Sequence, residues 1–327
     1  MLNSKLCLNE TIFTKDKDVK STRDGFGDGV ILAGRENENV VVLTADLEDS
    51  IRVSKFKEEF PKRFIEVGIA EQNMAGIAGG LALSGKIPFI TSFAVFNPGR
   101  NWEQIRLSIS YSNTNVKIVG SHAGLSACAD GGSAQALEDI ALTRVLPNLI
   151  VINPLDYFEA IKATVAAAKH KGPVYLRIYR EETPVITTKD SPFEIGKAYT
   201  LIEGKDITIL STGPITYEAL EAAKKLKAKY KISAEVISCS TIKPLDEKTI
   251  LESVAKTKKV VTLEEHNVMA GFGGAVCELL SEKHPIPVTR IGVEDKFGQS
   301  GKYKELKDKY GISSHHIIKK VLDFLKN

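Results

Sequence analysis

The stretch RFIEVGIAEQNMAGIAGGLA, residues 63–82, sets a short strand and a helix on either side of one glycine, Gly68. Apolar side chains recur at helical spacing after that glycine, and one carboxylate, Glu71, stands where the helix begins. A helix start favours an acid by roughly 0.3–1 kcal/mol, whereas a carboxylate left buried and unpaired costs several kcal/mol. Glu71 is therefore either a helix-capping acid or a group that the protein keeps for its chemistry.

Strand-like and helix-like runs alternate along the rest of the chain, which predicts parallel sheets with helices on both faces. Strands are expected at residues 40–44, 64–67, 87–91, 116–120, 150–153, 174–179, 207–211, 234–238, 260–263 and 288–291. Helices are expected at residues 24–35, 69–83, 102–111, 135–145, 156–169, 215–229, 246–256, 274–283, 302–309 and 314–325. The fold class is therefore α/β, with two three-layer domains.

The pattern also suggests where the domains begin and end. Residues 1–20 show no period and are expected to form an arm. A mostly parallel-sheet domain is expected at residues 21–185 and a smaller α/β domain at residues 197–327. Residues 186–196 lie in an irregular stretch that contains prolines and a Thr-Thr pair, so we interpret them as a linker.

The composition is that of an ordinary globular protein and points to no nucleic-acid or membrane partner. The 327 residues are 43% hydrophobic and 26% charged, and the net charge of +3 is spread over interspersed acids and bases. No apolar run reaches transmembrane length, and the polar N-terminus does not resemble a signal peptide. The cysteines lack metal-site spacing, so free thiols and a cytoplasmic location are expected: Cys7, Cys128, Cys239 and Cys277.

Polar turns follow several of the expected strands, and α/β proteins bind ligands beyond the carboxyl ends of parallel strands. These turns are Asp46–Ser50, Phe93–Arg100, His122–Gln135 and Arg177–Arg180, and Glu71 lies in another of them. Loops are also polar simply because they meet water. The clustering nevertheless favours a site at this edge of the first sheet.

Four longer motifs in these regions resemble the transketolase family. GIAEQNMAGIAGGLALSGKIPFITSFAVF, then GSHAG and ADGGSAQALEDIALTRVLPNLIVINP, are similar to its pyrimidine-binding domain. EDKFGQSGKYKELKDKYGISSHHIIKKV, residues 294–321, is similar to its C-terminal domain. Full-length transketolases begin with a separate domain that holds the diphosphate and its metal, and nothing in this chain resembles it. The resemblance therefore implies the C-terminal subunit of a split transketolase.

A short tripeptide could mislead here, because Gly27-Asp28-Gly29 spells GDG, the start of the usual thiamine diphosphate signature. That signature needs a preceding strand and an asparagine about 25–30 residues later, which completes an oxygen shell for Mg²⁺. Residues 24–34 read as a helix, and residues 52–60 contain no asparagine. We interpret this GDG as a coincidence and expect no metal ligand in the chain.

The resemblance gives Glu71 a chemical role. It matches the glutamate that hydrogen-bonds N1′ of the aminopyrimidine of thiamine diphosphate. A proton shared there favours the imino tautomer, whose nitrogen removes the proton from the thiazolium C2, so that C2 can attack a ketose carbonyl. Phe93 and Phe96 match aromatic walls of the aminopyrimidine slot, and core packing is the alternative for them. The family has a further aromatic residue shortly after these, where this chain reads Asn97-Pro98-Gly99.

Other matched positions would hold the sugar. His122 and Asp130 have the spacing of a substrate-channel histidine and an aspartate that binds a sugar hydroxyl. Arg23, Ser50 and Arg177 match positions that bind the sugar phosphate, and arginine suits this because its fork presents paired donors. The alternatives are a backbone-bonded histidine, a turn aspartate, surface ion pairs and a helix cap. Asp46 matches a residue near the cofactor.

One position departs from the family pattern. Transketolases usually read DGPTHQ where this chain reads DGGSAQ, so Ala134 replaces a histidine that touches the terminal hydroxyl of the donor. Losing such a hydrogen-bond donor costs about 2.7–4 kcal/mol of transition-state stabilisation in a matched site. Either Ser133 or Gln135 compensates, or the donor sugar differs, or the activity is weak.

The implied enzyme moves a two-carbon ketol unit from a ketose phosphate to an aldose phosphate. The partner would be an N-terminal subunit that carries the GDG…N motif, the diphosphate and Mg²⁺ or Ca²⁺. Two copies of each would form a dimer of heterodimers, and this chain alone would be inactive. The alternatives are a 1-deoxy-D-xylulose-5-phosphate synthase-like subunit, a 2-oxo acid dehydrogenase E1 beta-like subunit, and an inactive regulatory subunit. Glu264-Glu265-His266 is expected to serve packing between domains or subunits.

Overall fold

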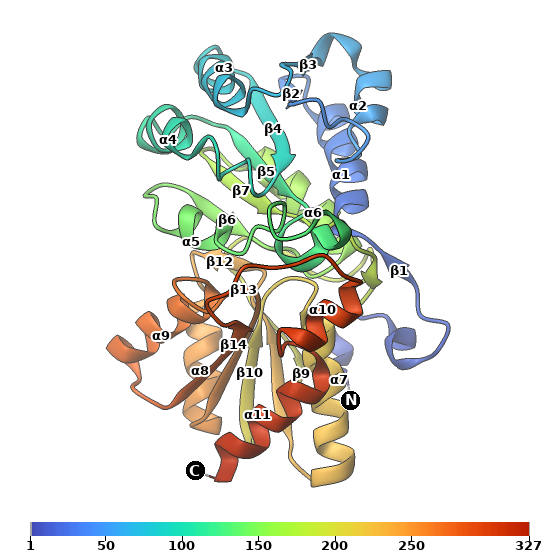
Figure 1. Ribbon diagram of the computed structural model, residues 1–327, viewed down its shortest axis with the longest axis vertical. Coiled ribbons are helices and arrows are strands. Elements are labelled where there is room, and N and C mark those ends of the chain that lie inside the picture. Colours follow the sequence, from blue (N-terminus) through green and yellow to red (C-terminus); the bar gives the residue numbers. More distant parts are fainter. Residues whose placement is uncertain (1, 327) are drawn as a thin grey trace.

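Two β-sheets lie one above the other in the computed structural model, which describes residues 2–326 (Figure 1). In that range, seven strands form the upper sheet in the order β12 (Thr241–Lys243), β6 (Ile150–Ile152), β7 (Val174–Arg177), β5 (Lys117–Ser121), β4 (Ile87–Phe93), β2 (Val40–Thr44) and β3 (Phe64–Glu66). Five strands form the lower sheet in the order β14 (Val288–Val293), β13 (Val260–Asn267), β10 (Ile207–Ser211), β11 (Ala234–Ser238) and β9 (Tyr199–Ile202). All neighbours are parallel except β12 with β6 and β9 with β11.

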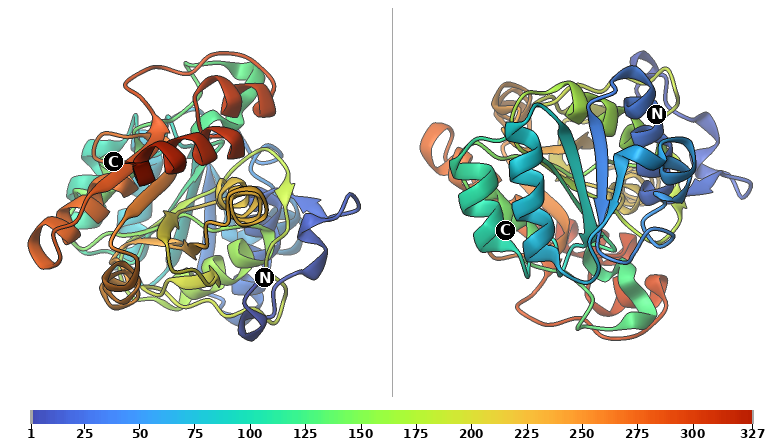
Figure 2. Two further views of the ribbon diagram at one scale, coloured as in Figure 1. Left: turned by 90° about the horizontal axis from the view of Figure 1, so that it is seen from below. Right: turned by 90° about the horizontal axis from the view of Figure 1, so that it is seen from above.

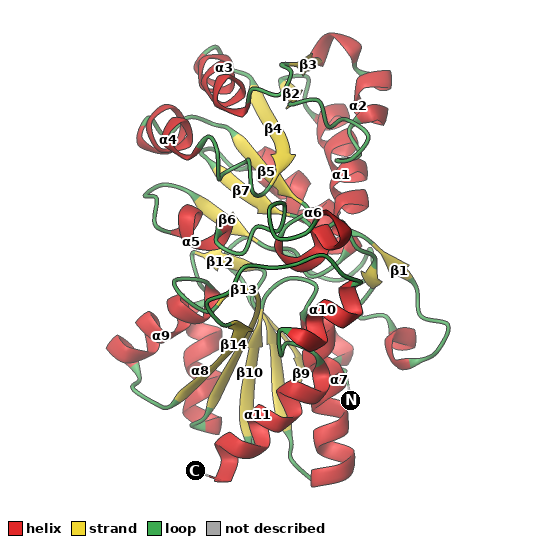
Figure 3. Cartoon of the chain, viewed as in Figure 1, coloured by secondary structure: helices red, strands yellow, loops and turns green. Residues whose placement is uncertain are grey.

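Helices surround both sheets, as the alternating sequence pattern predicts (Figure 3). They are α1 (Thr22–Glu36), α2 (Ser54–Glu59), α3 (Glu71–Leu83), α4 (Trp102–Gln104), α5 (Asp139–Arg144), α6 (Tyr157–Lys169), α7 (Thr216–Lys225), α8 (Glu247–Thr257), α9 (Phe272–Lys283), α10 (Tyr303–Lys309) and α11 (Ser314–Lys326). The helices α4 and α7 continue as π-helical turns at Ile105–Tyr111 and Leu226–Tyr230. The expected α/β class is confirmed.

Strand β2 shows why its sequence forms a central strand. All five of its residues are buried, which a continuous apolar run allows and an alternating one does not. Val41 and Leu43 belong to the core cluster that contains Met74 of α3, whereas Val42 belongs to the cluster that contains Phe26 of α1. Helices therefore lie on both sides of this sheet, as the end-on views also show (Figure 2).

The GDG tripeptide lies inside helix α1, as expected, and its Gly29, like the nearby Gly25, packs against α6. A Cβ on the nearby Gly25 would lie 2.3 Å from the carbonyl oxygen of Tyr157, and one on Gly29 would lie 2.9 Å from Thr164 Cβ. Asp28 accepts a 2.5 Å hydrogen bond from the Tyr157 hydroxyl. Glycine at these positions lets α1 and α6 approach closely.

Several elements differ from the sequence-based prediction, including α2, where no helix was expected. The helix expected from residue 135 begins only at Asp139, because Ala136 forms a parallel bridge with Ala123 and holds the chain extended there. Strands β9 and β12 were not expected, since each is a short antiparallel strand at a sheet edge. Because β12 pairs with β6, the sequence after the linker contributes a strand to the upper sheet. The proposed domain boundaries stay a prediction.

The N-terminal segment lies against the lower sheet. The backbone N–H of Asn3 donates to Leu201 O at 2.8 Å, and Leu2 bridges Ile202. Short 3₁₀ turns at Ser4–Leu6 and Glu10–Phe13 lead to β1 (Val19–Lys20), which pairs with β8 (Thr183–Pro184). Across residues 2–326, none of the helices combines the length and the apolarity needed to cross a membrane.

Candidate active site

The candidate residues gather at the carboxyl edge of the upper sheet. Strands β2, β4 and β5 are parallel neighbours, so the turns that follow them open on the same side. Phe93 ends β4, His122 follows β5, and Glu71 begins the helix after β3 (Figure 1). The fold therefore brings Glu71, Phe93 and His122 to one edge, although Glu71 and His122 are 51 positions apart in the sequence.

Glu71 is the buried acid of this edge. Its side chain is 2% exposed, and its two carboxylate oxygens have different partners. Oε1 accepts a hydrogen bond from the Ser92 hydroxyl at 3.2 Å, and Oε2 accepts one from Arg100 Nη1 at 2.9 Å. Asn101 Nδ2 donates to the backbone oxygen of Glu71 at 3.2 Å and fixes the start of α3. The carboxylate does not cap its helix, because its partners are the side chains of Ser92 and Arg100 and not backbone N–H groups.

Flat side chains are linked to this carboxylate through Arg100, which donates to Glu71 and lies over the Phe96 ring. The rings of Phe93 and Phe96 are nearly parallel, at 12°, with centroids 6.3 Å apart. The Phe93 ring stacks on His122 at 3.8 Å, and the guanidinium of Arg100 lies over the Phe96 ring at 4.7 Å. A planar group that donates an N–H to Glu71 therefore also contacts an aromatic face. An aminopyrimidine ring has this shape, and its ring nitrogen N1′ donates such an N–H when it is protonated, so these residues fit thiamine diphosphate.

His122 is a neutral histidine in a strained backbone. It is buried, its φ of 56° lies in the left-handed region, and its Nδ1 is 2.9 Å from the Ser121 hydroxyl. Burial, together with the positive charges of Arg23, Arg180 and Arg52, lowers the pKa of His122 to about 3. At neutral pH it can hydrogen-bond a ligand without carrying charge.

The arginines near His122 form a basic group that suits an anion. Arg23 Nη1 donates to the backbone oxygen of Ser50 at 2.9 Å, and among residues 2–326 its Nε is buried without a hydrogen-bond partner. Burial and repulsion from Arg52 lower the pKa of Arg23. Arg180 forms a 3.2 Å ion pair with Asp130 at the surface. A phosphate would relieve this repulsion and use the spare donor.

Arg177, predicted to bind the sugar phosphate, lies buried in the structure. Its side chain is 0% exposed and forms an ion pair with Asp139, with Nε 2.7 Å from Oδ2. Its Nη2 also donates to Glu265 O at 3.0 Å, and its Nη1 donates to the Tyr179 hydroxyl. All three of its nitrogens thus have partners inside the protein, and its role in binding a sugar phosphate stays a prediction.

Two residues that sequence reasoning left out of the site complete it. Arg180, three positions after Arg177, is the partly exposed arginine of this turn. Arg100 lies next to Glu71, as described above. The run Pro98-Gly99-Arg100 directly after the aromatic pair was the available signal, because an arginine there can turn back to the preceding helix.

The remaining candidates sit at the margin of the site. Asp46 is exposed, with φ of 60°, and its backbone N–H donates to Glu66 Oε1 at 2.9 Å. Near Ala134, the amide of Gln135 donates to Cys128 O at 3.3 Å and to Gln299 O at 3.0 Å, so it already holds two loops together. Ser133 is exposed and stays available as a substitute for the family histidine.

The Glu264-Glu265-His266 triplet packs the two sheets together, as expected. Glu265 Oε1 accepts from Leu125 N at 2.7 Å, and Oε2 accepts from the Tyr303 hydroxyl. Glu264 accepts from the first N–H groups of α9, at Phe272 and Gly273. Burial raises the pKa of both carboxyls to about 7. This contact fixes the segment that leads to Asp130.

Comparisons with known proteins agree with this geometry. Residues 18–185 match the family model "Transketolase, pyrimidine binding domain", and residues 196–317 match "Transketolase, C-terminal domain". A protein of Methanocaldococcus jannaschii described as a transketolase C-terminal section is 44% identical over 94% of this chain and 97% of its own. The 6-deoxy-6-sulfo-D-fructose transketolase subunit of a Clostridium species is 41% identical over 91% and 92%. A solved structure titled "Split gene transketolase, inactive beta4 tetramer" is 45% identical, covers 94% of this chain and 98% of its own, and has a TM-score of 0.88.

Proposed function

The chain belongs to the transketolase family, and from this premise we propose that it is the subunit that holds the aminopyrimidine of thiamine diphosphate in a two-subunit transketolase. The observation that supports this most is the buried Glu71 carboxylate, whose partner Arg100 stacks on the Phe96 ring. The partner subunit would carry the GDG…N motif, the diphosphate and Mg²⁺ or Ca²⁺. A dimer of heterodimers in the cytoplasm is the proposed assembly.

Within this subunit each residue has a distinct task. Thiamine diphosphate, when bound, supplies the nucleophilic carbon that takes up the two-carbon unit. Glu71 holds a proton between its carboxylate and the ring nitrogen N1′, and Ser92 keeps its other oxygen in place. Phe93 and Phe96 exclude water from the ring faces. These residues act on the cofactor, so their loss lowers turnover more than substrate affinity.

The sugar phosphates would bind beside His122, on the side where Arg23 and Arg180 lie. Arg23 and Arg180 hold the phosphate, with Ser50 at the end of the same loop, and the neutral His122 donates to or accepts from the sugar. Asp130 hydrogen-bonds a hydroxyl group of the sugar after its ion pair with Arg180 has broken. Ala134 leaves room where most of the family has a histidine that touches the terminal hydroxyl of the donor sugar. The donor is therefore expected to differ from the usual one at that hydroxyl.

Arg100 competes with the cofactor for the same two contacts. Its guanidinium is planar, donates to Glu71 Oε2 and stacks on Phe96, as the aminopyrimidine would. The side chain is 46% exposed and follows Gly99, so it can turn outward. We infer that cofactor binding displaces Arg100, and that the pair neutralises Glu71 until then.

This inference predicts that Arg100→Ala binds thiamine diphosphate about 10- to 100-fold more tightly in the assembled complex, since a hydrogen bond to a charged group contributes roughly 1.5–3 kcal/mol. Isothermal titration of the complex with the cofactor measures the change. The matched control is Arg106→Ala, an exposed arginine six positions on, which should bind like the wild type. Unchanged or weaker cofactor binding by Arg100→Ala would refute the competition.

A substrate panel tests the function itself. The two subunits, mixed with thiamine diphosphate and Mg²⁺, are assayed with xylulose phosphate plus ribose phosphate, and with pyruvate plus glyceraldehyde phosphate. Ketol transfer between the sugar phosphates is expected. Product from pyruvate instead would favour the deoxyxylulose-phosphate synthase-like alternative, and dependence on a lipoyl-carrying protein would favour the dehydrogenase-like one.

A further inference from the structure

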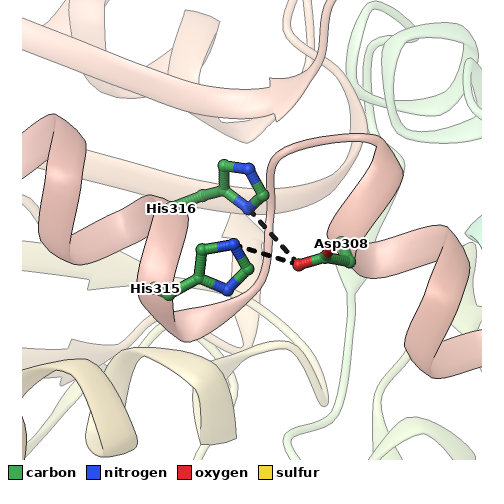
Figure 4. Close-up of side chains that lie close together, drawn as sticks. All are labelled: Asp308, His315 and His316. Carbon is green, nitrogen blue, oxygen red and sulfur yellow. Dashed lines mark ion pairs between the residues drawn. The ribbon is translucent and has the colours of Figure 1, made fainter.

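A cluster of three metal-binding side chains lies far from this site in the sequence, at the corner between the last two helices. Asp308 is in the last turn of α10, and His315 and His316 are in the first turn of α11 (Figure 4). Asp308 Oδ1 is 3.1 Å from His315 Nε2 and 3.7 Å from His316 Nδ1. The three donor atoms all lie within 4.8 Å of one another.

These separations suit one bound ion. Zn²⁺ binds histidine nitrogen at about 2.0–2.1 Å and carboxylate oxygen at about 2.0–2.2 Å, so donors around it lie roughly 3–3.5 Å apart. The two distances from Asp308 Oδ1 to the histidine nitrogens are close to this range. A small inward rotation of the side chains would bring all three donor atoms within it. Figure 4 shows both imidazole rings facing the carboxylate across the corner.

Ser313 supports the cluster from the connecting turn. Its hydroxyl donates to Asp308 Oδ1 at 3.1 Å and lies 3.0 Å from His315 Nδ1. If Nδ1–H donates to this hydroxyl, the Nε2 lone pair of His315 is left for a metal, which is how ligating histidines are commonly oriented. The same hydroxyl lies 3.0 Å from His316 Nδ1, a contact that a metal would replace.

The donor atoms select the kind of ion. Two of the three are imidazole nitrogens, from His315 and His316. Mg²⁺ and Ca²⁺ prefer oxygen ligands, so this donor set suits them poorly. Zinc, nickel and copper bind imidazole nitrogen directly.

We propose that Asp308, His315 and His316 bind a divalent late transition metal, with water completing its coordination, and that the metal ties α10 to α11. This site would be separate from the cofactor and from the metal that the partner subunit is proposed to hold. It does not rest on the proposed function, because its donors belong to helices outside the catalytic edge.

Titration of the whole chain with Zn²⁺, followed by calorimetry and elemental analysis after desalting, tests the proposal. One equivalent is expected, with binding at least tenfold weaker in His315→Ala and Asp308→Ala, and 10- to 100-fold weaker in Ser313→Ala. His284→Ala, which changes a histidine outside the cluster, should bind like the wild type. A chain that retains no Zn²⁺, a site lost in Cys7→Ser but kept in His315→Ala, or tighter binding of Mg²⁺ than of Zn²⁺ would each overturn it.

Discussion

Glu71→Ala is expected to lower kcat of the assembled enzyme by about 10²–10⁴-fold, the usual contribution of a positioned proton-transfer group. The alanine removes the carboxylate that shares the N1′ proton but leaves Phe93 and the phosphate-binding side intact. The KM for the sugar phosphates should therefore change little. Steady-state kinetics of the complex with saturating thiamine diphosphate measures both quantities.

Two further variants separate chemistry from folding. Glu71→Gln keeps the shape and the hydrogen bond to Ser92 but cannot share the proton in the same way, so it should lose nearly as much activity as the alanine variant. Glu58→Gln changes an exposed acid on α2 and should be fully active. A Glu71→Ala complex that turns over at the wild-type rate would exclude the proposed role.

Arg177→Met is expected to destabilise the chain by about 3–5 kcal/mol, the usual cost of removing one partner from a buried ion pair. The side chains of Arg177 and Asp139 are 0% and 1% exposed, and Asp139 also accepts from the Tyr175 hydroxyl at 2.7 Å. Burial alone raises the pKa of Asp139, but the Arg177 guanidinium holds it below its ordinary value. Without that partner, the carboxylate is left buried and uncompensated. Urea unfolding measures the loss.

The neighbouring arginine provides the matched control. Arg180→Met removes an exposed ion pair, so it should change the unfolding free energy by less than about 1 kcal/mol, yet raise the KM for sugar phosphates. The double variant Arg177→Met, Asp139→Leu should recover much of the stability, because no unpaired charge stays buried. If Arg177→Met were as stable as the wild type and weakened only phosphate binding, Arg177 would be a ligand-binding residue after all.

The sequence was sufficient for the sheet interiors because their strands are continuous apolar runs. The pattern predicted β2 and β11 at their observed bounds. It did not predict β9 or β12, since an edge strand of three or four residues needs a neighbour to define it, and that neighbour lies elsewhere in the chain. The late start of α5 has the same origin, because Ala136 pairs with Ala123 rather than joining the helix.

The site was only partly predictable for a related reason. Glu71, Phe93 and His122 could be chosen because they lie in turns that follow strands, and the fold brings these turns to one edge. The direction of a side chain within a turn is set by packing, so the sequence could not show that Arg177 lies inside the protein and Arg180 at its surface. The contact between Arg100 and Glu71 depends on how residues 97–101 fold back, which no periodicity encodes.

Reconstitution from separate subunits tests the central claim most directly. This chain, its proposed partner and their mixture are each assayed for transfer of a two-carbon unit between sugar phosphates, with and without thiamine diphosphate. The account predicts activity only in the mixture, and only with the cofactor. Full activity of this chain alone, or a mixture that forms the complex and binds the cofactor but transfers nothing with any sugar phosphate pair, would contradict it.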